Sequence, residues 1–302
     1  MLKIGFVVNG KKGRQKRFNQ ELDKLDNVIR NLNIIVKETS KTGHAITLAT
    51  ELADAGCTHI IAVGGDGTLN ETVNGVKKSS NLYCKVGMLT YGTANDFART
   101  ISAPKSLQEL LQAIEKGSYR KLDLGLIERK AGELLYKRYF INIADLGIGA
   151  EVVKRVNNSS KIFGSDVTFF GAIIRTFFSY TNQPVTCITD DWKWEGKINS
   201  LVIANGKYFG SGLCIAPEAD PSDGKFSIVI SGDIGLGDYL KNVVKIKKGK
   251  ILTHHKVEYK VARSLKITSP SADCCIEADG EFIGGTPVTV QVVKEGIDFI
   301  YR

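Results

Sequence analysis

The sequence lacks the features that mark several classes of protein. Only six of its 302 residues are proline, and neither a proline-rich nor a low-complexity segment divides the chain. No uncharged apolar run approaches the ~20 residues of a membrane-spanning helix, because residues 167–178 follow Asp166 and contain Arg175. The apolar run at residues 4–8 is too short for a signal peptide, and no small-residue cleavage site follows it. We therefore expect a cytoplasmic protein.

Cysteine chemistry is only weakly indicated. The six cysteines show no Cys-x-x-Cys spacing, which argues against a zinc site and against a dithiol redox motif. Cys274 and Cys275 are adjacent and would point to opposite faces of a strand. Reduced, partly buried thiols are the expectation for a cytoplasmic protein.

Positive charge and glycine are present in surplus. Lys and Arg number 41 against 32 Asp and Glu, which gives a formal charge of +9. The 31 glycines make up about 10% of the chain, where roughly 7% is usual. The ordinary share of hydrophobic residues, 43%, excludes disorder, collagen and coiled coil. The glycines indicate turns and ligand loops, and the charge indicates a phosphorylated ligand, nucleic acid or an acidic membrane surface.

The first third of the chain alternates strand and helix patterns. Short apolar segments predict strands at residues 2–8, 34–36, 59–63 and 86–89. Helical spacing of apolar residues predicts helices between them, at residues 22–32, 45–55 and 69–76. Short strands that are apolar on both faces and separated by helices predict a parallel sheet covered on two sides.

Strand patterns dominate after about residue 120. We expect strands at residues 136–144, 185–188, 198–204, 226–230, 257–261, 265–268, 274–278 and 288–293. Helices are expected at residues 150–156, 167–176 and 236–248. This half predicts an antiparallel sandwich or barrel beside the α/β domain. The expected domains are residues 1–128 and 129–290, with residues 291–302 returning to the first domain.

Residues 63–71 form a glycine-rich turn between a predicted strand and a predicted helix. Glycines let backbone N–H groups approach phosphate oxygens, Thr68 adds a hydroxyl, and the helix presents its positive N-terminus. The segment matches neither Walker A nor Gly-x-Gly-x-x-Gly. The alternative is a tight turn that Asp66 caps, and three glycines in four residues favour the phosphate site.

A second such loop, residues 92–99, follows the next strand. Thr93 can donate to a phosphate, Asp96 can hold a hydrated metal, and Arg99 can meet an anionic group. Alternatively Asn95 and Asp96 cap a helix, and Arg99 is a solvated side chain. Loops at the ends of neighbouring parallel strands would converge on one crevice.

The two glycine loops, residues 64–68 and 92–98, resemble those of the diacylglycerol kinase catalytic-domain family, which includes soluble bacterial lipid kinases and sphingosine kinases. Further similar motifs follow in family order at residues 121–125, 142–150, 161–164, 216–224 and 277–281. The first loop also occurs in NAD kinases and resembles that of phosphofructokinases, and the later motifs separate the chain from both. The resemblance implies an α/β nucleotide domain and a β-sandwich-like domain, with the active site in the cleft between them.

The reaction implied by this resemblance is transfer of the γ-phosphoryl group of ATP to the hydroxyl of diacylglycerol or a similar lipid alcohol, with Mg²⁺. The resemblance assigns the nucleotide to Thr39, Gly64, Gly65, Asp66, Gly67, Thr68, Leu69, Asn70 and Thr93. Thr39 fits equally well as a cap at the end of a strand.

A short Asp-Gly-Glu turn between two strands carries Asp279 and Glu281. The resemblance implies that this turn supplies the general base. We expect Glu281 to accept the proton and Asp279 to help position the hydroxyl or a metal. Without the resemblance, the segment is an ordinary charged hairpin turn.

The segment 220–225 resembles a divalent-ion site. The side chain of Asp223 would bind the ion together with the backbone carbonyls of Asp220 and Lys225, and such oxygen-only ligation suits Mg²⁺ or Ca²⁺. Many relatives carry Asp-Asp-Gly, whereas Ser222 replaces the first Asp here and removes one negative charge. A second, water-mediated magnesium network is implied by Asp66, Asp96 and Asp123. Further substrate or network residues are Asn95, Arg99 and Lys161.

Two basic segments indicate an anionic partner. Relatives usually carry Asn-Pro after the first strand, whereas this chain has Asn9-Gly10 followed by five basic residues between Lys11 and Arg17. These residues can meet nucleotide phosphates or anionic lipid, or simply begin a solvated helix. On residues 235–248, Lys241, Lys245 and Lys248 share one face, which fits an acidic bilayer or an ordinary surface helix.

Three functions remain in competition. The leading hypothesis is an ATP-dependent lipid kinase with peripheral membrane contact. Its oligomeric state is open, and a homodimer is one alternative. An enzyme that phosphorylates a soluble acceptor, as NAD kinases do, is the second. A catalytically silent nucleotide-binding module is the third, and its acidic residues argue against it because they repel anions unless a metal is bound. No RNA-binding motif is visible, so no nucleic-acid partner is expected.

Overall fold

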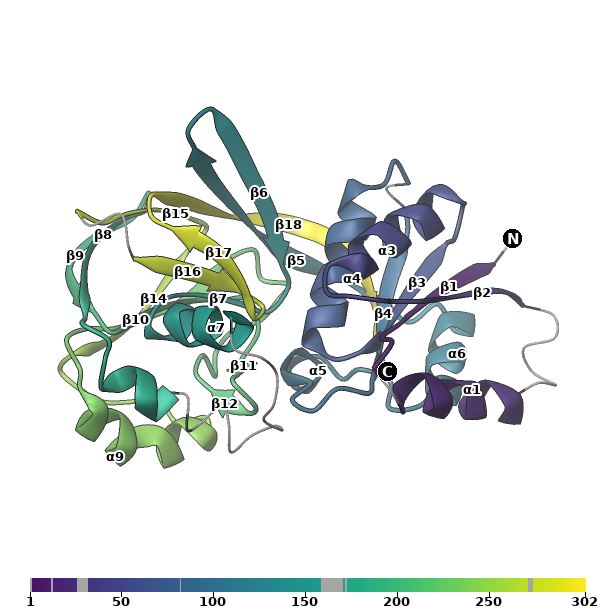
Figure 1. Cartoon of the computed structure of the whole chain (residues 1–302), viewed down its shortest axis with the longest axis horizontal. Helices are drawn as coiled ribbons and strands as arrows, with labels where there is room; N and C mark the ends of the chain where they lie inside the picture. The colour runs from purple at the N-terminus through teal and green to yellow at the C-terminus, as the bar shows by residue number, and fades with distance from the viewer. Residues whose placement is uncertain are drawn as a thin grey trace. The chain divides into compact units, whose positions relative to one another are not determined.

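The computed structural model describes residues 2–11, 13–25, 32–81, 83–158, 171, 173–270 and 274–302, and the chain divides into two compact units (Figure 1). The first unit comprises Met1–Leu122 and Glu295–Arg302, and the second comprises Asp123–Lys294. The sequence suggested boundaries at residues 128 and 290. The divisions differ from these because two long strands, β5 (Tyr119–Ala131) and β18 (Val288–Ile300), each run through both units.

A parallel sheet forms the centre of the first unit, in the order β2-β1-β3-β4-β18. Only the last part of β18 takes part, through Phe299 beside Val86. All six residues of β3 are buried, as expected of a strand covered on both faces. The other strands of this sheet are β1 (Lys3–Val8), β2 (Asn33–Glu38), β3 (His59–Gly64) and β4 (Lys85–Thr90).

Helices cover both faces of this sheet (Figure 1). On one face lie α1 (Arg14–Lys24) and α6 (Leu107–Glu115), and Phe18 of α1 packs on Phe6 with ring centroids 5.0 Å apart. On the other lie α3 (His44–Asp54) and α4 (Asp66–Lys78). The short α5 (Asp96–Thr100) follows β4. The predicted α/β domain is confirmed, but its first helix spans Arg14–Lys24 and so begins before the expected 22–32, of which residues 26–31 lie outside the described residues.

The second unit is an antiparallel β-sandwich, as predicted. One sheet has the order β14-β13-β10-β7-β16-β17. The other sheet contains the first part of β18, β15, β8 and β9. A buried apolar core joins the two sheets, and in it Phe140 and Phe226 stack with centroids 5.6 Å apart. The strands of the first sheet are β7 (Ile143–Gly147), β10 (Ser200–Ala204), β13 (Phe226–Ser231), β14 (Val257–Ala262), β16 (Cys275–Ala278) and β17 (Glu281–Gly285); those of the second include β8 (Gln183–Ile188), β9 (Lys193–Ile198) and β15 (Ser264–Thr268).

Two predicted strands were wrong in extent. The expected strand 136–144 is divided into β6 (Leu134–Phe140) and β7, because a carboxylate from elsewhere in the chain binds the backbone N–H groups of residues 141–143. The expected strand 198–204 is divided between β9 and β10 at Asn199, whose N–H donates to the carbonyls of Ser231 and Gly232. The sequence also did not indicate the hairpin that β5 and β6 form.

Helices and a small hairpin lie against the outer face of the six-stranded sheet. They are α7 (Ile148–Asn158), α9 (Leu236–Lys247) and the hairpin of β11 (Tyr208–Phe209) and β12 (Leu213–Cys214). Most of the expected helix 167–176 lies outside the described residues. The part that is described, residues 171 and 173–177, is helical. All six cysteines are buried free thiols. No helix within the described ranges is long and apolar enough to cross a membrane.

Candidate functional site

The two glycine-rich loops meet at the carboxyl ends of β3 and β4, which confirms the predicted convergence. A Cβ atom on Gly92 would lie 2.5 Å from the Cα of Gly65, so the two backbones touch where only glycine fits. A Cβ on Gly64 would lie 2.5 Å from the hydroxyl of Thr68, which lies in the first turn of the helix that follows. The loops are therefore held together by backbone contact.

The N-terminus of α4 is the part of this unit suited to phosphate. Gly65 precedes the helix in an extended conformation, and Gly67 in its first turn is exposed with open space where a side chain would be. Backbone N–H groups and the positive end of the helix dipole favour an anion at such a position. Thr93, in the neighbouring loop, is exposed to solvent. The arrangement suits the phosphates of a nucleotide.

Side chains from the ends of β1 and β2 support these loops. Asn9 donates from Nδ2 to the hydroxyl of Thr68 over 3.0 Å, and Thr39 accepts from the N–H of Gly10 over 3.1 Å. A Cβ on Gly10 would lie 2.1 Å from the carbonyl oxygen of Thr39. This contact explains why the chain has glycine here. Thr39 thus acts at least as the strand-end cap.

Asp66 and Asp96 lie together, and the structure shows what Asp66 binds. Its two carboxylate oxygens accept the N–H groups of Asp96 and Phe97, each over 3.1 Å, so Asp66 caps the start of α5. Asn95 stands at the N-cap position with a positive φ of 49° and bonds back to the Gly92 carbonyl. Arg99, half exposed, lies 3.8 Å from the carboxylate of the buried Asp96.

The remaining predicted nucleotide residues, Leu69 and Asn70, are fully buried in α4. They therefore stabilise the helix rather than offer side chains at the surface. Sequence analysis missed the next residue, Glu71, whose carboxylate accepts the N–H groups of Gly43 and Ala45 over 2.8 and 3.0 Å. Glu71 therefore fixes the start of α3 against α4. Its position directly after the glycine motif is the sequence feature that could have indicated this role.

In the second unit, Asp123 and the segment 220–225 come together. The buried carboxylate of Asp123 accepts the N–H of Gly224 over 2.7 Å, and its own N–H donates to the carbonyl of Pro221 over 2.7 Å. Asn205 donates to the Asp123 carbonyl over 2.9 Å. Asp123 therefore holds the loop that sequence analysis assigned to a divalent ion.

That loop is rich in oxygen atoms, and several are already bonded. Asp220 accepts from both the N–H and the hydroxyl of Ser222, over 3.0 and 2.7 Å. Burial raises the pKa of Asp223, and the charges of Asp220 and Asp123 raise it further. The backbone N–H and the charged side chain of Lys225 act in the opposite direction and lower it. Among the described residues, no group of three or more His, Cys, Asp or Glu side chains is placed to hold a metal. The loop fits an ion bound by one carboxylate, backbone carbonyls and water.

The Asp-Gly-Glu segment is a hairpin between β16 and β17. Asp279 accepts the N–H groups of Ile141, Asn142 and Ile143 over 2.8, 3.1 and 2.9 Å, which produces the break between β6 and β7. Its carboxylate thus anchors the turn to the neighbouring strand. This occupation favours a structural role over contact with a hydroxyl or a metal.

Glu281 forms an ion pair with Arg138 of β6. The side chain of Arg138 is 10% exposed and that of Glu281 is 28% exposed, so the carboxylate is held at a partly open position. Sequence analysis missed Arg138, because β6 carries no motif and its pairing with Glu281 joins residues far apart in the chain.

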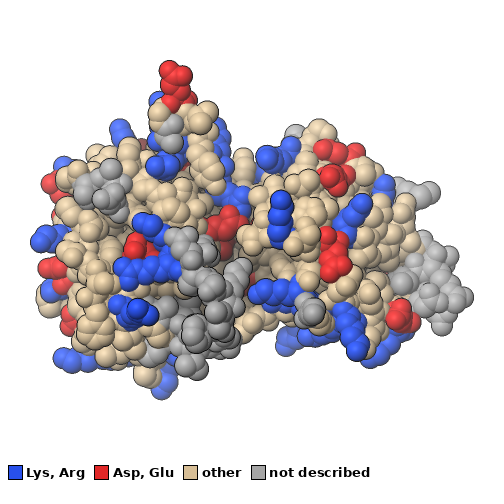
Figure 2. Space-filling view, in the orientation of Figure 1, with Lys and Arg blue, Asp and Glu red and all other residues tan. Residues whose placement is uncertain are grey.

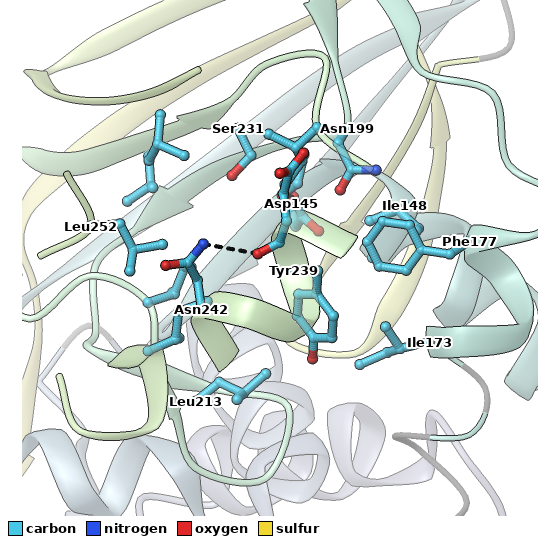
Figure 3. Close-up of a pocket in the computed structure, with 18 of the residues that line it drawn as sticks. Asp145, Ile148, Ile173, Phe177, Asn199, Leu213, Ser231, Tyr239, Asn242 and Leu252 are labelled. Carbon is cyan, nitrogen blue, oxygen red and sulfur yellow. Dashed lines mark hydrogen bonds between the residues drawn. The ribbon is translucent and has the colours of Figure 1, made fainter. Parts of the chain in front are cut away.

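An apolar cavity of about 100 Å³ lies on the outer face of the six-stranded sheet (Figure 3). Its walls come from β7, β10, β13, α7, α9 and the residues around β12. Figure 3 shows apolar side chains around the space and Asp145, Asn199 and Ser231 close together at one side. Lining residues include Ile148, Val152, Ile173, Phe177, Leu213, Val229, Ile234, Tyr239, Ile246 and Leu252.

Among the charged groups of this cavity, Asp145 lies on β7, the strand that pairs with β16. It accepts the hydroxyl of Ser200 over 2.6 Å, and on the sheet it stands opposite Glu277 of β16. Burial raises its pKa to about 7, although Ser200 and two backbone N–H groups oppose the shift. A Cβ on Gly149 would lie 1.9 Å from its carboxylate, so α7 starts with glycine against it. The lining is mostly apolar, with polar side chains near Asp145 and further ones, Asp238, Asn242 and His254, in and after α9.

The predicted residues thus form one group in the first unit and two sets in the second. Thr39, residues 64–70, Thr93, Asn95, Asp96 and Arg99 gather at the ends of β3 and β4 in the first unit. In the second, Asp123 joins residues 220–225, and Asp279 and Glu281 share a hairpin. Lys161 lies outside the described residues.

Two family models match the chain. The diacylglycerol kinase catalytic domain matches residues 3–127, and the YegS C-terminal NAD kinase beta sandwich-like domain matches residues 142–301. Together they cover most of the sequence.

Individual proteins are similar over nearly the whole chain. A diacylglycerol kinase of Staphylococcus saprophyticus is 28% identical over 263 residues, which are 86% of this chain and 82% of that protein. A solved structure of a diacylglycerol kinase from Bacillus anthracis matches with a TM-score of 0.70 and 19% identity, over 99% of this chain and 97% of that one. Yeast NADH kinase has the same fold, with a TM-score of 0.58, 10% identity and coverage of 100% and 84%.

Proposed function

The chain belongs to the diacylglycerol kinase catalytic-domain family, and from this premise we propose that it transfers the γ-phosphoryl group of ATP to the hydroxyl of diacylglycerol or a similar lipid alcohol. The chain is a lipid kinase. The observation that carries the choice of acceptor is the apolar cavity of the second unit. A soluble, charged acceptor would not be stabilised by contact with apolar side chains, whereas an acyl chain is stabilised when it is removed from water there.

ATP is assigned to the loops of the first unit. The N-terminus of α4 and the loop around Thr93 would receive the phosphates, because backbone N–H groups there need no side chain to reach an anion. The backbone contact between Gly65 and Gly92 fixes the position of one loop relative to the other. Asp66 acts by holding α5, and Thr39 by holding the loop after β1.

Glu281 is assigned as the general base. A base must be ionised, oriented and open to the substrate, and Glu281 is partly exposed and held by Arg138. Asp279 assists by anchoring the turn through its three backbone hydrogen bonds. The lipid would lie with its acyl part in the apolar cavity.

Mg²⁺ is assigned to the oxygen-rich loop 220–225 and to the aspartates of the phosphate loops. Asp223 stands among like charges from Asp220 and Asp123, which a cation would relieve. Asp96 offers a second buried carboxylate in the first unit. When bound, Mg²⁺ neutralises charge on the phosphates during transfer.

An acceptor panel tests the proposed function. Purified protein receives γ-labelled ATP and Mg²⁺ together with diacylglycerol micelles, other lipid alcohols or NAD in separate reactions. We expect label in a lipid phosphate and none in NAD. Label in NAD alone would establish the soluble-acceptor alternative, and ATP binding without transfer to any acceptor would establish the silent module.

Contact with an acidic membrane is proposed along α9. Its outer face exposes Leu240 and Val244, four residues apart and 45% and 59% exposed, beside the exposed Lys241 and Lys245. Figure 2 shows basic side chains over the end of the second unit that carries α9. Apolar side chains bordered by lysines suit the head-group layer of an anionic bilayer. The inner face of the same helix lines the cavity, through residues such as Tyr239.

Vesicle flotation tests this contact. Lys241→Glu combined with Lys245→Glu should reduce binding to anionic vesicles by at least about tenfold, because each lysine near such a surface contributes about 1 kcal/mol. The control makes the same charge change on β9, with Lys193→Glu and Lys197→Glu. Equal binding of the protein to neutral and anionic vesicles, or equal loss in both variants, would contradict docking through α9.

A further inference from the structure

The hairpin that carries Glu281 has a two-residue turn. Ala278 pairs with Glu281, and the turn residues between them, Asp279 and Gly280, have positive φ angles of 48° and 83°. Two consecutive residues with positive φ are typical of the tight turns that join antiparallel strands, and Asp-Gly is a favoured sequence for them. The direction in which Glu281 leaves the turn therefore depends on these two residues.

A side chain from the preceding strand fixes this turn. Glu277, which is 5% exposed, accepts the N–H of Gly280 with its Oε2 over 2.8 Å. The strand pairing shifts between Ile276 and Glu277, so an irregularity begins where this side chain leaves the strand. Asp279 holds one side of the turn through the strand residues 141–143, and Glu277 holds the other.

The surroundings of Glu277 are acidic. Asp145 stands opposite it on β7, Asp279 and Glu281 follow on its own hairpin, and Glu151 and Lys154 face the neighbouring Cys275 from α7. Burial raises the pKa of Glu277 well above its usual range, and the charge of Asp145 raises it further. The hydrogen bond from the Gly280 N–H lowers the pKa and so opposes this shift. A carboxyl group that retains its proton still accepts a hydrogen bond through its carbonyl oxygen.

We propose that Glu277 is a positioning residue of the lipid kinase, which fixes the Gly280 amide and thereby the direction of Glu281. The inference rests on the proposed function only for its effect on phosphate transfer. Glu277 needs no contact with substrate, and its required property is an acceptor oxygen at the Gly280 amide. Through its strand neighbour Asp145, Glu277 also stands next to the apolar cavity, so the hairpin and the cavity share one buried carboxyl pair.

The experiment compares Glu277→Gln with Glu277→Ala. Glutamine keeps the acceptor oxygen and the volume, so kcat should stay within about twofold of wild type. Alanine removes the acceptor, so kcat should fall by at least about tenfold while KM for ATP stays unchanged, because a misplaced base costs rate without affecting nucleotide binding. Glu258→Ala, on β14 of the same sheet, is the control and should leave kcat unchanged.

A second readout needs no substrate. Hydrogen exchange of the Gly280 amide should accelerate in Glu277→Ala and stay slow in Glu277→Gln, which would separate this inference from a failure of the proposed function. Full kcat and slow exchange in Glu277→Ala would overturn the inference, because the turn would then keep its conformation without Glu277. Loss of kcat in Glu277→Gln equal to that in Glu277→Ala would also overturn it, since the acceptor oxygen would not be the required property.

Discussion

The two units hold their predicted functional groups by different means. In the first unit the loops are positioned by backbone contact, with Gly92 against Gly65 and Gly10 against Thr39. In the second, charged side chains hold one another, as Glu281 and Arg138 do, or hold backbone amides, as Asp279 does. The comparison teaches that added volume should damage the first unit, whereas changes of charge at constant volume should damage the second.

The two Asp-Gly motifs show what the units share. Asp66 accepts two backbone N–H groups and Asp279 accepts three, in each case from a segment distant in the sequence. Both aspartates thus bind the protein itself. The groups that we propose for contact with phosphate and hydroxyl therefore include backbone amides in the first unit and the carboxylate of Glu281 in the second.

The largest effect should come from Glu281→Gln, which keeps the volume and removes the basic carboxylate. We expect kcat to fall by about 10³-fold with KM for ATP nearly unchanged, because general base catalysis contributes about 10²–10⁴-fold. Steady-state kinetics with a lipid acceptor measures it. A variant with more than a tenth of wild-type kcat would show that another group takes the proton.

Volume is tested by Gly92→Ala. Its Cβ would lie 2.5 Å from the backbone of Gly65, so the loops must separate, at a cost of about 2 kcal/mol in the free energy of unfolding. Gly67→Ala is the matched control, since its Cβ meets open space and alanine favours the helix. Denaturant unfolding without nucleotide compares them, and equal stability of the two variants would refute packing by backbone contact.

Asp145→Asn tests the buried charge of the second unit. Burial raises the pKa of Asp145 from 3.8 to about 7, so folding favours its protonated form. The contribution of this proton to stability is full below about pH 4 and is lost as the pH rises to about 7. Relative to wild type, the variant should therefore gain roughly 2 kcal/mol between about pH 5 and about pH 8.

Denaturant unfolding at several pH values measures this gain. Asp191→Asn, an exposed aspartate of the same unit, should show no such trend. A constant difference between Asp145→Asn and wild type across the range would mean that Asp145 ionises normally in the folded protein.

The smallest effect is expected of Arg138→Gln. Glu281 would keep its charge and lose its orienting partner, so kcat should fall by about tenfold. The control, Arg129→Gln, changes the same hairpin of β5 and β6, where Arg129 donates to the Gly285 carbonyl over 2.8 Å. Equal losses in both variants would indicate that Arg138 merely stabilises the hairpin.

Local pattern explains which parts of the molecule could be predicted. The alternating strands and helices of the first unit, the glycine loops and the Asp-Gly turn are short-range features that glycine and periodicity reveal. The role of Asp66 depends on α5, some 30 residues later in the chain. The pairing of Asp145 with Glu277 follows from strand register, which one sequence does not specify. The ion pair of Arg138 with Glu281 joins strands of two different sheets, which local pattern does not reveal either.

The same reason applies to the broken strands and to the cavity. Residues 136–144 carry a continuous strand pattern, and only the distant Asp279 divides them. The cavity joins residues from β7 to β14. Asp145, Ile148 and Gly149 belong to the motif at residues 142–150, but that motif does not reveal which distant residues complete the cavity.

The central claim is that the cavity of the second unit receives the lipid, and one kinetic comparison tests it most directly. Transfer from labelled ATP to diacylglycerol is measured for wild type and for Leu252→Trp, which fills the cavity, with Leu135→Trp at an exposed position as control. We expect a loss of at least about tenfold in kcat/KM for the lipid in Leu252→Trp alone, with KM for ATP unchanged. Unaltered transfer by Leu252→Trp would contradict it.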